Sequence, residues 1–164
     1  MDEPMIRSAV ASDAVAIGKL WEKLVAFHRE IDADMPRSTL QGASLYARSL
    51  SDRLNDSHTR VLVAEEDGRI VGYVLGVMVD LMPEMFEQEA GGFLADIFVE
   101  EAYRGQGVGR ALVEGLIDWF REKGLKHYEW HVAATNGSAI AFWEQLGGRP
   151  WQIRMRADIG DSDS

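Results

Sequence analysis

Three glycines at alternate positions, Gly105, Gly107 and Gly109, separate a strand-like run from an amphipathic segment. Glycine at this density removes side chains from a turn, so that a ligand can approach the backbone closely. The helix that we expect to begin there presents unpaired N–H groups and the positive end of its dipole, which together bind phosphate groups. The stretch therefore predicts a loop that binds a phosphate-bearing ligand.

The spacing of these glycines argues against two common phosphate loops. A Walker A loop requires Gly-Lys-Ser/Thr after its spacer, and no lysine follows here. A dinucleotide fingerprint requires glycine where Arg110 stands, although Glu129 lies about 20 residues downstream as that fingerprint prefers. Too few residues follow Arg110 to complete a dinucleotide-binding domain. A nucleotide-binding protein of another kind, using the loop for ATP or NAD, stays open as an alternative.

Hydrophobic periodicity along the chain predicts a mixed α/β sheet. Strand patterns cover Met5 to Ala9, Arg60 to Glu65, Ile70 to Val79, Gly92 to Val99, Tyr128 to Ala133 and Trp151 to Ala157. Helical patterns run from Ser12 or Asp13 to about Ile31, over Leu40 to Asn55, from the glycine loop to Gly124, and over Ser138 to Leu146. The sequence Glu66-Asp67-Gly68-Arg69 predicts a hairpin turn, and Leu81 to Gly91 a loop.

Composition argues against several classes of protein. The chain has no cysteine, which removes thiolate nucleophiles and disulfides, and its four histidines lack the H-E-x-x-H spacing, so we expect no metal site. A net charge of −10 disfavours a nucleic-acid surface and is compatible with a cationic acceptor, although acidity also serves solubility. The longest apolar run is too short to span a bilayer, and the acidic N-terminus does not resemble a signal peptide. We therefore expect a cytoplasmic protein with no membrane partner.

The segment R-x-x-G-x-G, from Arg104 to Gly109, resembles the coenzyme A loop of the GCN5-related N-acetyltransferases. Leu94 to Val99 resembles the fourth strand of that family, and Asn136 to Gly147 its later N-x-x-A-x-x-F-Y-x-x-x-G motif. The matching segments follow the family's order and cover nearly the whole chain. The resemblance implies the acyl-CoA N-acyltransferase fold, an α/β fold with a mixed, mostly antiparallel sheet of six to seven strands and about four helices. It also implies a single domain over residues 1–164, with an ordered core of about 5–157 and an acidic tail of 158–164.

By this resemblance the ligand of the loop is acetyl-CoA, used as cosubstrate without a metal. The backbone N–H groups of the loop are expected to hold its pyrophosphate, with Arg104 and Arg110 as charge partners. The cofactor-binding residues predicted in the loop are Arg104, Gly105, Gln106, Gly107, Val108, Gly109 and Arg110.

The resemblance places the rest of the cofactor along the preceding strand. The backbone of Ile97, Phe98 and Val99 is expected to pair with the pantetheine arm, and an amide there to polarise the thioester carbonyl. Asn136 is expected to hydrogen-bond the pantetheine or the gap between strands, with a helix cap as the alternative. Phe142 is expected to pack on the cofactor or to belong to the core.

Direct attack of a neutral amine on the thioester is the chemistry that the resemblance implies, and it requires a proton acceptor. Asp96 is the candidate base, because it is a carboxylate inside an apolar strand where burial would raise its pKa. The alternative is a structural carboxylate. Trp143 stands where many members of the family carry a tyrosine that protonates the leaving thiolate, and an indole is too weak an acid for this. A non-catalytic acyl-CoA-binding or regulatory module is therefore a second interpretation.

The acceptor is expected to bind at the end of the first helix, with His28 and Asp32 as candidate contacts and a solvated helix end as the alternative. A small-molecule primary amine fits the acidity of the chain, and a protein or peptide amine is the alternative. The family resemblance also implies a homodimer. The loop with Met82, Met85 and Phe86 is expected to cover the pocket, the core or a dimer contact.

Overall fold

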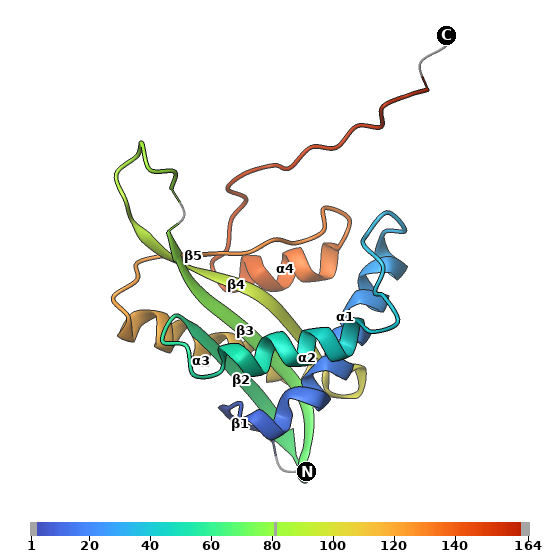
Figure 1. Cartoon of the computed structure of the whole chain (residues 1–164), viewed down its shortest axis with the longest axis vertical. Helices are drawn as coiled ribbons and strands as arrows, with labels where there is room; N and C mark the ends of the chain where they lie inside the picture. Colours follow the sequence, from blue (N-terminus) through green and yellow to red (C-terminus); the bar gives the residue numbers. More distant parts are fainter. Residues whose placement is uncertain (1–2, 81, 162–164) are drawn as a thin grey trace. The chain divides into compact units, whose positions relative to one another are not determined.

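The computed structural model describes residues 3–80 and 82–161. These residues divide into two units, one that ends at His131 and one that begins at Val132. The first unit contains a five-stranded sheet in the order β1-β2-β3-β4-β5. Figure 1 shows α1 and α2 on one face of this sheet and α3 on the other.

The elements of the first unit follow the predicted order along the chain. Its strands are β1 (Met5–Ser8), β2 (Thr59–Glu66), β3 (Arg69–Asp80), β4 (Ala90–Val99) and β5 (Tyr128–Glu129). Its helices are α1 (Ala14–Ile31), α2 (Gly42–Arg53) and α3 (Val108–Glu122), with short 3-10 helices at Ala11–Asp13 and Glu101–Tyr103. In the second unit, α4 (Gly137–Gln145) is the only helix of the described residues, and no strand forms there.

The sheet is mostly antiparallel, as predicted, but it has five strands in the described residues rather than six to seven. The first four strands pair antiparallel with their neighbours, and β5 pairs parallel with β4 over two residues. The strand predicted from Trp151 to Ala157 is wrong, because this segment has neither helix nor strand. Its alternating apolar side chains have the strand period, but a strand also requires a hydrogen-bonded partner, which alternation does not supply.

The hairpin predicted between β2 and β3 is confirmed. Asp67 and Gly68 connect the two strands with φ angles of 49° and 74°. Positive φ at both central residues is what a type I′ turn requires, and Asp-Gly is a favoured pair for it.

Close helix–helix contact fixes α2 against α1. A Cβ atom added at Gly18 of α1 would lie 2.5 Å from the carbonyl oxygen of Ala43 and 3.3 Å from the Cβ of Ala47, both on α2. Small residues on both helices therefore let the two backbones approach. The core beneath them joins Ile17 and Leu20 of α1 and Leu50 of α2 to the inner face of the sheet.

The opposite face of the sheet is equally tight against α3. A Cβ atom at Gly76 of β3 would lie 2.3 Å from a methyl group of Leu116, and one at Gly92 of β4 would lie 2.7 Å from the ring of Phe120. The large side chains of α3 thus sit directly on backbone. This contact holds α3 against β3 and β4.

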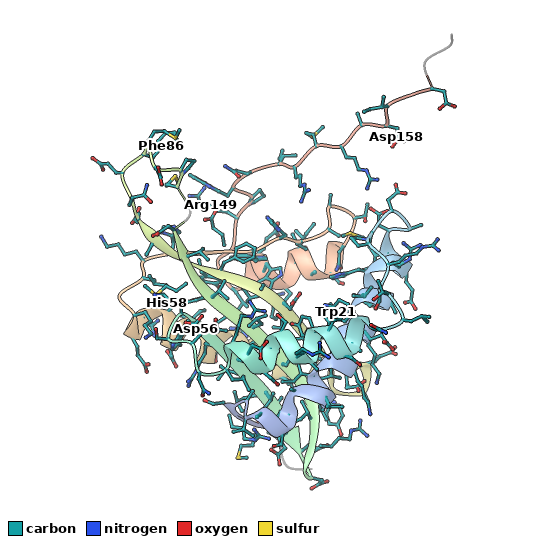
Figure 2. The ribbon with its side chains drawn as sticks, in the orientation of Figure 1. Trp21, Asp56, His58, Phe86, Arg149 and Asp158 are labelled. Atoms are coloured by element: carbon teal, nitrogen blue, oxygen red, sulfur yellow. The ribbon has the colours of Figure 1, made fainter. Side chains whose placement is uncertain are left out.

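The loop between β3 and β4 is confirmed, with β3 ending at Asp80 and β4 beginning at Ala90. Leu81 of the predicted range lies outside the described residues. Met85 and Phe86 are 81% and 58% exposed, and Figure 2 shows Phe86 near the tip of the loop. No helix among the described residues is long and apolar enough to cross a membrane.

Candidate functional site

The predicted phosphate loop ends in an open helix N-terminus. Gly107 is the N-cap of α3 and has a φ of 84°, and Gly105 has a φ of 74°. Residues other than glycine rarely adopt such positive φ angles. A Cβ atom at either residue would have no described atom within 4 Å, so the space beside the backbone is open. The first N–H within α3 that pairs back along the helix is that of Ala111, which donates to Gly107. The preceding N–H groups of the first turn are the donors that an anion would use.

The polar side chains of the loop are held in different ways. Arg104 donates from Nε to the carbonyl oxygen of Val99 at 2.8 Å. Its guanidinium carbon lies 4.8 Å from the ring centre of Phe27 and 5.1 Å from that of Phe98. Gln106 donates back to the carbonyl of Ala102 at 3.1 Å, and Arg110 is exposed. Arg110 forms only an exposed ion pair with Glu114 at 3.8 Å, so it is the loop cation that could turn to a phosphate, whereas Arg104 joins the loop to β4.

β4 has an unpaired edge directly before this loop. It pairs with β5 only at Gly92 and Phe93, and among the described strands only β3 accompanies it from there to Val99. The N–H of Glu100 donates to Val71 at 2.8 Å, on the β3 side. Because backbone groups alternate in direction along a strand, those of Ile97 and Val99 point to the unpaired edge. Two of the three residues predicted to pair with a pantetheine arm thus have backbone groups that point to the open edge of β4, whereas the backbone groups of Phe98 point to β3.

A β-bulge at Ala95 sets the direction of Asp96. Asp96 is opposite Leu75 on β3, whereas the next pair is Gly76 with Leu94, so Ala95 is the extra residue. A bulge redirects the side chains that follow it. Asp96 consequently shares the face of Leu75 and Phe98, which is the face covered by α1 and α2.

The half-buried carboxylate of Asp96 has one close polar partner. The hydroxyl of Tyr46 on α2 donates to its Oδ2 at 2.8 Å. Burial raises the pKa of Asp96, and the Tyr46 hydrogen bond and the charge of Arg53 act against this rise. A buried carboxyl group whose pKa is raised above its ordinary value is suited to accept a proton during a reaction.

His28 and Asp32 lie at the end of α1, as predicted, but within the described residues neither forms a hydrogen bond or ion pair with Asp96. His28 is half-buried, and burial lowers its pKa below the ordinary value of histidine, which favours the neutral imidazole. The Oδ1 of Asp32 accepts from the N–H of Asp34 at 2.9 Å. Asp32 therefore stabilises the turn that follows α1, and one oxygen remains for an acceptor.

The second unit contains the remaining two predicted residues. The Oδ1 of Asn136 accepts from the N–H of Ala139 and the hydroxyl of Ser138, both at 3.2 Å, which makes Asn136 the N-cap of α4. Phe142 and Trp143 pack edge to face with ring centres 5.0 Å apart. The role of Asn136 and Phe142 towards a cofactor stays a prediction.

Tyr46 is the polar group at Asp96 that sequence analysis missed. It lies 50 residues from Asp96 in the chain and on another element, so no local spacing connects the two. The only signal was its place four residues before Leu50, on the buried face of the helix. Among the described residues, no group of three or more histidine, aspartate or glutamate side chains is arranged to hold a metal ion.

The chain belongs to the acetyltransferase (GNAT) family, whose family model matches residues 22–148. One relative is the N-acetyltransferase YhfO of Bacillus subtilis, which is 29% identical over 144 residues that cover 87% of each chain. Another is the glucosamine 6-phosphate N-acetyltransferase of Trypanosoma brucei brucei, which is 30% identical over 62% of this chain and 65% of the relative.

Solved structures share the fold. A mutant of the BH1408 protein of Bacillus halodurans superposes with a TM-score of 0.84 at 24% identity, covering 94% of this chain and 99% of that one. An aminoglycoside N-acetyltransferase in complex with CoA superposes with a TM-score of 0.73 at 16% identity, covering 97% of both chains. The resemblance inferred from the glycine loop is therefore confirmed at the level of family and fold.

Proposed function

We propose that the protein transfers the acetyl group of acetyl-CoA to a primary amine of a small molecule. The observation that carries this proposal is the open, glycine-bearing N-terminus of α3 directly after the unpaired edge of β4. The helix N-terminus supplies hydrogen-bond donors for a pyrophosphate, and the strand edge supplies donors and acceptors for an extended chain that contains amides. Family membership supports acetyl-CoA as the molecule that has both parts. We also propose that residues 1–164 act as one domain, because the family match extends across both units.

The described residues divide the binding of acetyl-CoA between them. The N–H groups of Val108, Gly109 and Arg110 would hold the pyrophosphate, with the Arg110 guanidinium nearby. The backbone groups of Ile97 and the N–H of Val99, whose carbonyl oxygen already accepts from Arg104, would pair with the pantetheine amides. An N–H on this edge would donate to the thioester carbonyl oxygen, where negative charge develops during attack. Gly105 and Gly107 keep side chains out of the approach.

Asp96 is the proposed proton acceptor of the reaction. A cationic acceptor first loses one proton to water. The neutral amine nitrogen then attacks the carbonyl carbon of the thioester, a C–N bond forms, and the C–S bond breaks to release the thiolate of CoA. The proton lost by the amine passes to the carboxylate of Asp96, directly or through water. Trp143 has no acidic proton to donate, so the thiolate leaves as such or takes its proton from water.

A small-molecule amine is the proposed acceptor class. One relative is named for glucosamine 6-phosphate and one structural neighbour for aminoglycosides, both of which are small molecules with amino groups. The net charge of −10 would attract a cationic amine over a distance. His28 and the free oxygen of Asp32 are proposed as acceptor contacts at the end of α1.

We also propose that the protein is a homodimer. Trp151, Ile153 and Met155 are 62%, 81% and 83% exposed, and the loop between β3 and β4 exposes Met85 and Phe86. Apolar side chains at such exposure are typical of surfaces that pack against another chain. Sedimentation equilibrium would give the mass, and a monomer at micromolar concentration would contradict this part of the proposal.

The test of the function combines binding with turnover. Calorimetric titration with CoA, ATP and NAD identifies the ligand of the loop, and we expect binding of CoA that ATP and NAD do not displace. Release of free thiol from acetyl-CoA is then followed over polyamines, aminoglycosides, amino acids and short peptides. CoA binding without release by any amine would favour the binding-module alternative, and release by peptides alone would favour a protein or peptide acceptor.

A further inference from the structure

We infer that Tyr46 is a positioning residue for Asp96, holding one carboxylate oxygen so that the other is presented to the acceptor amine. This inference rests on the proposed function, in which Asp96 accepts the proton. Tyr46 itself touches neither substrate nor cofactor in this account. It acts through the carboxylate.

The hydrogen bond itself defines the orientation. The Tyr46 hydroxyl donates to Oδ2 of Asp96 at 2.8 Å, and it is the one side-chain hydrogen bond that Asp96 makes among the described residues. The rotation of a carboxylate about its terminal bond is otherwise broadly allowed. A single donor at one oxygen therefore decides where the second oxygen, Oδ1, lies.

Aromatic packing fixes the Tyr46 ring in turn. Its ring stacks on that of Trp21 of α1, with centres 5.1 Å apart and planes inclined by 13°. On its other side the ring meets Tyr73 of β3 edge to face, with centres 6.2 Å apart. Figure 2 labels Trp21 beside the α2 ribbon. The hydroxyl of Tyr46 is thus aimed by two contacts that its own helix does not supply.

The glycine contacts between the two helices set the distance. Gly18 allows the backbone of α2 to approach at Ala43, and a Cβ atom at Gly42 would lie 2.9 Å from the ring of Trp21. Both contacts are within one turn of Tyr46. The close approach of α2 to α1 therefore brings the Tyr46 hydroxyl within reach of β4.

Both phenols at this place remain protonated. Burial raises the pKa of Tyr46 and of Tyr73 above the ordinary range of tyrosine, and the charge of Asp96 raises both further. Tyr46 consequently keeps its proton at neutral pH and donates it in the hydrogen bond to the Asp96 carboxylate. The Tyr73 hydroxyl is fully buried and close enough to the Tyr46 hydroxyl to affect its pKa, but among the described residues it forms no hydrogen bond of good geometry and none with Asp96. Tyr73 therefore supports Tyr46 without holding Asp96.

The charged and titratable groups that act on Asp96 are few. Tyr46 and Arg53 come from α2 and favour the ionised carboxylate, and burial opposes them. Tyr73 comes from β3 and is neutral. Removing the Tyr46 hydroxyl leaves Asp96 buried but deletes the hydrogen bond that stabilises its ionised carboxylate. The pKa of Asp96 is therefore expected to rise.

The primary experiment reads the carboxyl group and does not depend on turnover. The Asp96 side chain is followed by 13C NMR through a pH titration of the wild type, Tyr46→Phe and Tyr73→Phe, with the resonance assigned from Asp96→Asn. We expect the midpoint to rise by about one pH unit in Tyr46→Phe and by less than half of that in Tyr73→Phe. An unchanged midpoint in Tyr46→Phe, or equal shifts in both variants, overturns the inference.

A second measurement uses the wild-type fold. With 3-fluorotyrosine in place of tyrosine, the 19F resonance of Tyr46, assigned by replacing the other three tyrosines in turn, is expected to titrate with the midpoint of Asp96. If the chemical shift of this resonance does not change as Asp96 titrates, the hydrogen bond is contradicted. This test holds even if Tyr46→Phe does not fold.

Kinetics then separate this inference from the proposed function. In Tyr46→Phe the acidic limb of kcat is expected to move to higher pH by the same shift, with the KM for the amine unchanged. If Tyr46→Phe acetylates amines and the acidic limb of its kcat profile is not shifted, the positioning role of Tyr46 is overturned and the proposed function stands. A wild type that transfers no acetyl group contradicts the proposed function, while the NMR titration still decides whether Tyr46 holds Asp96.

Discussion

The Nε of Arg104 donates to the carbonyl oxygen of Val99 at 2.8 Å, which joins the glycine loop to the unpaired edge of β4. The same guanidinium lies over the rings of Phe27 and Phe98, so α1 is part of the contact. Three segments that would meet acetyl-CoA and its acceptor are therefore connected through one side chain. A change at Arg104 is expected to alter the loop and the strand edge together.

Arg104→Ala is expected to weaken CoA binding by about tenfold, because the loop loses its hydrogen bond to β4 and its packing on two rings. Arg104→Lys is the matched control, since it keeps the charge but not the planar fork. We expect lysine to restore less than half of the lost binding free energy in calorimetric titration. Full restoration would show that charge alone matters at this position.

Gly109→Asp is expected to lower the affinity for CoA by at least about tenfold, because a carboxylate in the first turn of α3 repels the pyrophosphate. The same charge favours the helix N-terminus by about 0.3–1 kcal/mol, so the melting temperature should not fall. Gly109→Asn has nearly the same size without the charge. Equal losses in the two variants would indicate a steric effect, and no loss in either would remove the phosphate from this loop.

Asp96→Asn is expected to lower kcat by about 10²–10⁴-fold and to remove the acidic limb of the pH–rate profile. The pKa of Asp96 is higher in the folded protein than in the unfolded chain, where it is about 3.9. Ionisation of Asp96 therefore destabilises the folded protein as the pH rises from the unfolded pKa through the folded pKa. Asp96→Asn cannot ionise and does not lose this free energy of unfolding. The stability of the variant relative to the wild type should therefore increase as the pH rises. Denaturant unfolding at several pH values measures this, and normal turnover with reduced stability would assign Asp96 a structural role.

Asp13→Asn is expected to destabilise the protein by about 1–3 kcal/mol at neutral pH. Asp13 accepts from both terminal nitrogens of Arg7 at 2.7 and 3.0 Å and is nearly buried. The Arg7 hydrogen bonds lower the pKa of Asp13, so this stability is present above its unfolded pKa and is lost as pH falls through the folded one. The difference between variant and wild type should therefore shrink in acid.

The exposed pair of Asp118 with Arg121 is the matched control for Asp13. Its side chains are 67% and 72% exposed, although its 2.7 Å separation equals that of the partly buried pair of Arg7 and Asp13. Asp118→Asn is expected to change the free energy of unfolding by less than about 0.5 kcal/mol. Similar losses at Asp13 and Asp118 would contradict the effect of burial.

Gly76→Ala is expected to destabilise the fold by about 1–3 kcal/mol, because the new Cβ would lie 2.3 Å from a methyl group of Leu116 in a packed layer. Gly137→Ala at the start of α4 meets no described atom within 4 Å and should be neutral or slightly stabilising. Thermal unfolding of both variants measures the difference. An unchanged melting temperature for Gly76→Ala would mean that α3 moves freely over the sheet.

Local sequence patterns predicted most of the elements. The Asp67-Gly68 turn, the apolar stripe of α3 and the start of α3 after the glycines depend on neighbouring residues only, and the structure contains all three. The binding of phosphate by the glycine loop stays a prediction. The sixth strand was predicted wrongly because Trp151, Ile153 and Met155 show the strand period in a segment that no described strand pairs with. Periodicity reports which faces are apolar, and hydrogen-bonded pairing is a property of two segments.

The site was predictable only as far as it is local. The order of strand, loop and helix indicated the glycine loop, and the family resemblance indicated Ile97 to Val99. Neither indicated that the Phe98 backbone faces β3 or that Arg104 bonds to Val99. The Ala95 bulge that turns Asp96 towards α2 leaves no mark in the composition of β4. Tyr46 reaches Asp96 because α1 and α2 touch at Gly18, which is a tertiary contact that no sequence window contains.

Release of free CoA thiol from acetyl-CoA, measured with and without a panel of small-molecule amines, tests the central claim most directly. Wild-type protein is compared with Gly109→Asp at equal folded concentration. We expect at least one class of small amine to stimulate release in the wild type, and Gly109→Asp to lose that stimulation at acetyl-CoA concentrations near the wild-type KM. CoA binding by the wild type with no release stimulated by any amine would contradict the assignment of this protein as an acetyltransferase acting on small amines.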